Sequence, residues 1–129
     1  MKARIGVMSE ELIRKRMIDV ATGKVAHDDK APKFWFTSLA GVSQLLCPEN
    51  IKLLILMDKE KPNNLTELSQ LSGRSISNLS HTIKSLSAKG FVRVEKQGRV
   101  TRPVALFTDF EIVMGEGVEN ASVKEKAAA

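Results

Sequence analysis

The sequence predicts a mainly α fold with a small β-sheet, and two stretches of the chain lead to that prediction. Between residues 65 and 90, apolar residues recur at three- and four-residue steps on both sides of a Ser-Gly-Arg segment, as in two helices joined by a tight turn. Residues 91–104 then combine strand-forming residues with a Gln-Gly turn signal, which predicts a hairpin. This order predicts a winged helix-turn-helix over about residues 38–113, with an N-terminal helical extension.

The first 33 residues are expected to form that extension, a helix followed by a linker. Residues 1–7 are expected to be a loose lead. Ser9 precedes two glutamates, so a cap and an acidic first turn predict that a helix starts there and ends near Gly23. One side of this helix is apolar, and its members are Leu12, Ile13, Met17, Val20 and Ala21. This side either pairs two chains or folds back on its own core, and the sequence leaves both open.

No pattern in the chain predicts an enzyme, a cofactor or a metal. His27 lies beside two aspartates in the linker, but His81 and the single Cys47 are not at ligand spacing to it. A structural metal site gathers four ligands in recognisable pairs, so no metal site is expected. A single cysteine suits a reducing cytoplasm. No run of eighteen apolar residues is present, so no membrane span is expected.

Residues 34–64 are expected to supply the core that supports the helix-turn-helix. Phe34-Trp35-Phe36 predicts a short strand, more typical of a core or interface than of base stacking. Residues 38–46 predict a helix, and Pro48 suits the first position of the next one. Thr66 is the expected cap of the first helix of the motif. The inward side chains of the earlier helix are expected to be Leu39, Val42, Leu45 and Leu46.

The motif itself consists of a short helix, the Ser72-Gly73-Arg74 turn and a recognition helix over residues 75–89. Leu68 and Leu71 are expected to face inward on the first helix. Ser75 can cap the second, and Gly90 suits a left-handed position after its end. The apolar stripe of the second helix consists of Ile76, Leu79, Ile83 and Leu86.

The opposite face of the recognition helix is polar and contains no acid. Its residues are Ser77, Asn78, His81, Lys84 and Ser85. Such a face can lie against phosphates and base edges without repelling them, although an ordinary solvated helix can also be polar. The wing and the placement of charge favour the nucleic-acid interpretation.

The wing is expected over residues 92–103, with Pro103 interrupting the strand pairing. Its cations are Arg93, Lys96, Arg99 and Arg102. Residues 104–107 and 110–113 are expected to continue past the wing as strands. The DNA-binding domain is thus expected over residues 34–114, and residues 115–129 are expected to be a disordered tail.

Charge is concentrated on this motif. The 38 residues from Thr66 to Pro103 hold seven cations and two acids, a net +5 that equals the net charge of the whole chain. The other 91 residues hold thirteen of each and balance. Because Lys and Arg at phosphates supply most non-specific affinity for DNA, this clustering predicts double-stranded DNA as the partner.

The stretch FTSLAGVSQLLCPENIKLLILM, followed by LTELSQLSGRSISNLSHTIKSLSAKGFV, resembles the MarR-like winged helix-turn-helix regulators of bacteria and archaea. Within them it is similar to a subgroup regarded as antitoxins, over roughly residues 34–113. The resemblance implies a dimeric repressor of transcription or, alternatively, an antitoxin that neutralises a cognate toxin and regulates its own operon. It also implies a set of residues facing the major groove, with His81 where Arg is commoner: Arg74, Ser75, Ser77, Asn78, His81 and Lys84.

Overall fold

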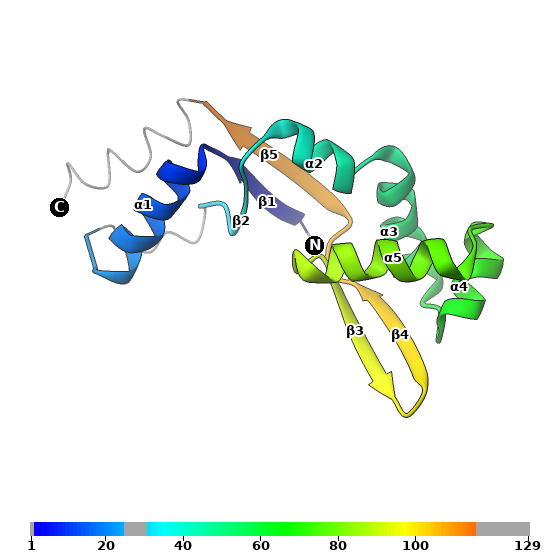
Figure 1. Cartoon of the computed structure of the whole chain (residues 1–129). Helices are drawn as coiled ribbons and strands as arrows, with labels where there is room; N and C mark the ends of the chain where they lie inside the picture. The colour runs from blue at the N-terminus through cyan, green and yellow to red at the C-terminus, as the bar shows by residue number, and fades with distance from the viewer. Residues whose placement is uncertain (1, 25–30, 116–129) are drawn as a thin grey trace. The chain divides into compact units, whose positions relative to one another are not determined.

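The structure is a computed structural model that describes residues 2–24 and 31–115 (Figure 1). The chain forms two compact units. Among the described residues, one unit consists of Lys2 and Ser43–Asp109, and the other consists of residues 3–24, 31–42 and 110–115. The expected linker around His27 and the expected disordered tail beyond Gly115 lie outside the described residues.

The second unit contains a three-stranded sheet in the order β2-β1-β5. Its strands are β1 (Lys2–Val7), β2 (Phe34–Phe36) and β5 (Asp109–Met114), and β1 runs parallel to β2. The expectation that residues 1–7 are a loose lead is therefore wrong. Ala3, Ile5 and Val7 are buried, so the central strand is stabilised by apolar burial. β5 pairs in this sheet and not with the wing.

Gly6 lies against the aromatic ring of Trp35, its partner residue on β2. A Cβ atom at position 6 would be 2.2 Å from Cζ3 of the indole. The glycine therefore allows the ring to lie directly on the backbone of β1. The guanidinium carbon of Arg16 lies 5.5 Å from the centre of the same ring, at cation–π distance.

Helix α1 (Glu10–Ala21) follows β1. Ser9 caps it as expected, and its hydroxyl oxygen accepts a hydrogen bond from the backbone N–H of Leu12 at 3.3 Å. Much of its apolar surface is exposed. Leu12, Met17, Ile18 and Val20 have between 37% and 59% of their surface accessible.

The first unit contains most of the helices, namely α3 (Pro48–Glu60), α4 (Leu65–Ser72) and α5 (Ile76–Ala88), and α2 (Leu39–Leu45) leads into it. Pro48 is the first residue of α3, as expected. Val42 is buried, but Leu39, the first residue of α2, is exposed, so the expectation that Leu39 faces inward is wrong. Among the described residues, no single helix is long and apolar enough to cross a membrane, although α2 and α3, taken together across a bend, pass that test.

Helices α4 and α5 form the predicted helix-turn-helix. Gly73 ends α4 in the left-handed region with a φ of 75°. Asn64, not Thr66, is the cap of α4: its side-chain oxygen accepts from the N–H of Glu67 at 2.8 Å, and the Glu67 carboxylate accepts from the N–H of Asn63 at 2.6 Å. This reciprocal pairing satisfies two free donors at the helix start, so it is favoured over a threonine two residues later.

The buried core of this unit comes from all three helices and the base of the hairpin. Leu71 and Ile76, at the two helix ends beside the turn, are about half exposed, so the expectation that they face inward is wrong. The side chains with at most 3% of their surface accessible include Leu53, Leu54, Met57, Leu68, Leu79, Ile83, Leu86 and Phe91.

The wing is an antiparallel hairpin of β3 (Val92–Gln97) and β4 (Val100–Ala105), which projects from the helices in Figure 1. Gly98 adopts a φ of 63° in the turn. Pro103 does not interrupt the pairing, because it lies opposite Val94 within the ladder. In a two-stranded sheet both strands are edges, so a residue without an N–H is tolerated where that group would point outward.

Candidate nucleic-acid interface

Helix α5 presents the expected polar face. Ser75 caps the helix, and its hydroxyl oxygen accepts from the N–H of Asn78 at 3.1 Å. The exposed side chains include Ser77, Asn78, His81 and Lys84. At 100° per residue, Ser77, His81 and Lys84 lie along the middle of the face, whereas Asn78 lies on one flank. Ser85 is half-buried, and its hydroxyl donates to the carbonyl of His81 at 3.1 Å.

The other flank of α5 borders a groove of about 430 Å³ between the helix and the wing. Lys84 and Lys96 line it from opposite sides. The remaining lining residues are Leu65, Ser80, Ile83, Ser87, Val94 and Thr101. This groove combines two cations and three hydroxyl groups with three apolar side chains and no acid, and the cations and hydroxyl groups at its edges are of the kinds that bond to a phosphate backbone.

The hairpin register sorts the wing cations between two faces. Side chains alternate along a strand, and residues directly opposite each other share a face. Lys96 is opposite Thr101, and both line the groove beside α5. Glu95 is opposite Arg102, and they share the other face with Arg93. Arg99 lies in the turn at the tip.

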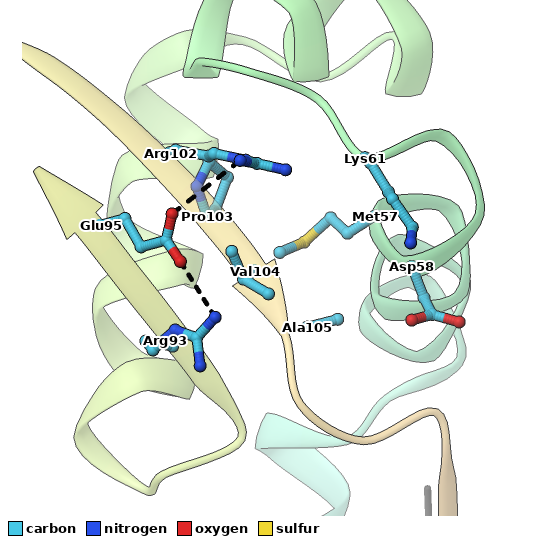
Figure 2. A pocket seen from close by; sticks show the side chains of 9 residues that line it. All are labelled: Met57, Asp58, Lys61, Arg93, Glu95, Arg102, Pro103, Val104 and Ala105. Atoms are coloured by element: carbon cyan, nitrogen blue, oxygen red, sulfur yellow. Dashed lines mark hydrogen bonds and ion pairs between the residues drawn. The ribbon is translucent and has the colours of Figure 1, made fainter. Parts of the chain in front are cut away.

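Figure 2 shows this second face, where the wing borders a cavity of about 250 Å³ against the end of α3. Glu95 pairs there with both arginines. Its Oε1 is 2.9 Å from Nη2 of Arg93, and its Oε2 is 3.9 Å from Nη1 of Arg102. Two of the four predicted wing cations are therefore paired with a carboxylate of the same hairpin. By contrast, no carboxylate pairs with Lys84, Lys96 or Arg99 among the residues that the structure describes.

Arg74, in the turn of the motif, bonds to side chains of its own unit. Its Nη1 donates to Oδ1 of Asn50 at 3.2 Å, and its Nη2 donates to Oγ1 of Thr82 at 2.8 Å. Its Nε donates to Oδ1 of Asn78 at 2.7 Å. Asn50 and Thr82 are each only 8% exposed. Asn50 in turn donates from Nδ2 to the carbonyl of Leu45 at 2.8 Å, so the network connects α2, α3 and α5.

The structure thus places the ten predicted DNA-binding residues in three groups. Exposed on or beside α5 are Ser75, Ser77, Asn78, His81 and Lys84, while Lys96 and Arg99 lie on the groove face and at the tip of the wing. Arg74, Arg93 and Arg102 are bonded within the unit. Sequence reasoning missed Ser80, Ser87 and Thr101 in the groove, and the role of Glu95. The alternation of residues on the two wing strands is the signal that could have identified Thr101 and Glu95.

Within residues 2–24 and 31–115, no group of three or more His, Cys, Asp or Glu side chains is arranged to hold a metal ion. The pKa of the Glu49 carboxyl is lowered from its ordinary value of 4.5 by hydrogen bonds from its own backbone N–H and from Cys47. Glu49 lies in the first turn of α3, where a negative charge is favoured, and its lowered pKa reflects helix capping.

Comparisons with known proteins give one family match. The family model HVO_A0114 matches residues 45–112, which is more than half of the 129-residue chain. No curated protein sequence matches the chain. Two solved structures from Thermotoga maritima are similar at low identity. The transcriptional regulator Tm0710 has a TM-score of 0.43 and 19% identity, over 92% of this chain and 72% of that one. A MarR-like transcriptional regulator, tm0816, has a TM-score of 0.41 and 14% identity, over 92% of this chain and 75% of that one.

Proposed function

The chain belongs to the HVO_A0114 family, whose matched region contains the whole of this basic interface, and we propose that the interface makes the protein a regulator of transcription that binds specific sequences of double-stranded DNA. The observation that carries the proposal is the groove between α5 and the wing. It is lined by Lys84 and Lys96 without an acid, next to an exposed helix face of short donors and acceptors.

In this proposal α5 lies in the major groove and the wing lies along the backbone. Asn78 and His81 have the side chains that can bond to base edges, while Lys84 and Lys96 bind the phosphates that pass between the helix and the wing. Arg99, at the tip, reaches the next phosphates or the minor groove. Phosphate contacts set the register on the duplex, and contacts from the helix to base edges supply the sequence preference.

We further propose that the regulator is a homodimer that acts as a repressor. Dimeric readers of this kind bind two half-sites about one helical turn apart. Exposed apolar side chains on α1, together with Ile112 and Met114 on β5, offer a surface that a second copy can cover. Sedimentation at micromolar concentration tests this, and a 14.2 kDa species that stays monomeric on DNA would contradict it.

The same exposed apolar residues support one alternative, in which a cognate toxin protein binds there and DNA binding serves autoregulation. The two functions predict different oligomeric states for the isolated protein. A regulator that pairs through this surface is a dimer alone, whereas an antitoxin that uses it for a toxin is monomeric until that protein is present. Co-expression with the product of the neighbouring gene, followed by sedimentation, separates them.

The test of DNA binding compares two variants on a preferred duplex and on a scrambled one, at several salt concentrations. The preferred duplex is selected from the protein's own upstream region. Asn78→Ala should cost about 1–3 kcal/mol on the preferred duplex and relax its preference. Arg99→Ala should weaken both duplexes equally and reduce the salt slope by about 0.9. If neither variant changes affinity, the basic region has another partner and the proposal is wrong.

The magnitude of the salt slope is a further check. If all seven cations between Thr66 and Pro103 met phosphates, log Kd would change with log salt by about 6 per protomer. If the phosphate contacts come from Lys84, Lys96 and Arg99, the slope is about 3 per protomer. We expect a slope of about 3–4, because Arg74, Arg93 and Arg102 bond to side chains of their own unit, and Lys89 is the one further cation of the motif that could add a contact.

A further inference from the structure

Arg74 and Asn78 are joined by a short hydrogen bond at the edge of the proposed interface. The Nε of Arg74 is 2.7 Å from Oδ1 of Asn78. The other two nitrogens of the guanidinium bond to the side chains of Asn50 and Thr82, which are nine-tenths buried. Because the guanidinium is planar, the bonds to Asn50 and Thr82 hold its position and orientation. The Nε–H that Asn78 accepts from is therefore fixed by the core of the unit.

The chemistry of this pair fixes the orientation of the Asn78 amide. A guanidinium has only hydrogen-bond donors, and an amide has an accepting oxygen at one end and a donating NH₂ at the other. Asn78 must therefore turn its oxygen toward Arg74 and its NH₂ away. The flipped amide would place donors against donors, so the Arg74 Nε–H would exchange its bond to Oδ1 for a bond to water.

We propose that Arg74 is a positioning residue for DNA recognition, which locks the Asn78 amide in one orientation and so determines the base that it reads. The inference rests on the proposed function. The Oδ1 atom keeps one free lone pair, which can accept from the adenine N6 amino group, and the NH₂ group can donate to adenine N7. With the amide in this orientation, N6 and N7 can be met in one order along the groove. The reversed order is excluded, because it needs the flipped amide.

This role differs from the groove contact that the sequence predicts for Arg74, and the two roles give different results for the Arg74→Lys variant. Lysine keeps the positive charge for a phosphate, but its compact ammonium cannot replace the planar fork that bonds three separate acceptors. If Arg74 is a phosphate contact, the Arg74→Lys variant preserves both affinity and base preference. If Arg74 is a positioning residue, the same variant loses base preference.

The experiment measures binding of the full chain to the preferred duplex and to duplexes with each base pair changed singly. Arg74→Lys should reduce discrimination about tenfold at the one base pair where Asn78→Ala also reduces it, with the salt slope unchanged. The double variant should discriminate no worse at that base pair than Asn78→Ala alone. Unchanged discrimination in Arg74→Lys, or losses that add in the double variant, would overturn the inference.

Thr82→Val is the matched control. It removes the acceptor of Nη2 in a side chain of nearly the same shape but leaves the Arg74 to Asn78 bond in place. It should lower the melting temperature and reduce base discrimination much less than Arg74→Lys does, because Asn50 still holds Nη1 and the bond to Asn78 remains. If Thr82→Val lost discrimination as strongly as Arg74→Lys, the effect would be a general loosening of the turn, and the positioning role would be refuted.

A measurement without DNA separates the failure of this inference from the failure of the proposed function. In the free protein, exchange of the Arg74 Nε–H proton with water, followed by NMR, should be about tenfold faster in Asn78→Ala than in the unchanged chain, because the bond is absent. An unchanged exchange rate overturns the lock itself. If exchange of the Arg74 Nε–H proton is slower in the unchanged chain than in Asn78→Ala, but the protein selects no duplex, the lock exists and the proposed function is wrong.

Discussion

Replacing Arg74 by alanine should destabilise the helix-turn-helix unit, and the structure allows the size of the effect to be worked out. The substitution removes three hydrogen bonds from a charged donor, at 2.7, 2.8 and 3.2 Å. The bond to Asn78 is exposed and contributes little. The other two acceptors belong to Asn50 and Thr82, which are buried, and a bond from a charged group to such an acceptor contributes about 1.5–3 kcal/mol.

The expected loss for Arg74→Ala is therefore about 3–6 kcal/mol, a large part of the 5–15 kcal/mol that holds a typical domain folded. For a unit of this size, each kcal/mol lowers the melting temperature by about 4–8 °C. Urea denaturation followed by circular dichroism at 222 nm measures the free energy of unfolding from the helices.

A companion variant replaces Arg74 and its two buried acceptors, Asn50 and Thr82, by apolar residues. Arg74→Met combined with Asn50→Leu and Thr82→Val removes the donor together with the buried side-chain acceptors, and the Leu45 carbonyl is then the one group of the network that loses a partner, the Asn50 amide. We expect it to recover at least half of the stability lost in Arg74→Ala, because removing both partners of a buried bond costs much less than removing one. A loss below about 1 kcal/mol in Arg74→Ala would refute a structural role for the network.

Three further predictions follow from other contacts. Glu95→Gln should change the affinity for any duplex by less than about twofold, because the two arginines that it releases lie on the wing face opposite the groove; a salt titration checks this, and a larger rise for all duplexes alike would show that those arginines reach DNA. Gly6→Ala should destabilise the chain by about 1–3 kcal/mol, because the added methyl group would overlap the Trp35 ring, and a thermal melt checks this. Glu49→Gln should make the free energy of unfolding less dependent on pH in acid. Because the pKa of the Glu49 carboxyl is lowered in the folded chain, its contribution to stability is present above pH 4.5 and is lost as the pH falls through the folded pKa. An equal loss of stability on acidification in the variant and in the unchanged protein would contradict this prediction.

The local signals in the sequence were strong where short-range chemistry decides the structure. The Ser75 cap, the left-handed Gly90 and the Gln97-Gly98 turn are each determined by neighbouring residues, and all three are confirmed. Asn64 was missed, although its amide oxygen accepts from the N–H of Glu67 and so makes the cap. The Glu67 carboxylate accepts from the N–H of Asn63, the residue before the cap, so this arrangement resembles a capping box only when residues 63, 64 and 67 are considered together.

The N-terminal strand shows what local signals cannot predict. β1 is short, carries Lys2 and Arg4, and has a glycine near its end, so its own residues give a weak strand pattern. It is ordered by partners from distant parts of the chain, β2 from about thirty residues later and β5 from more than a hundred residues later. Gly6 is explained only by Trp35, which covers it. Pairing between distant segments depends on tertiary packing, which periodicity in one segment does not report.

The basic cluster shows a different limit, because the sequence located the charge but not its partners. Counting Lys and Arg treats Arg74 and Lys84 alike, yet the guanidinium of Arg74 bonds to buried acceptors whereas Lys84 lines an open groove without an acid. Geometry explains the difference: a planar fork can satisfy several buried oxygens at once, while a strongly hydrated ammonium favours solvent. Arg74 therefore serves mainly to hold the proposed reading surface, Arg93 and Arg102 are paired on the far face of the wing, and the lysines on either side of the groove, with Arg99 at the tip of the wing, are left to meet the phosphates.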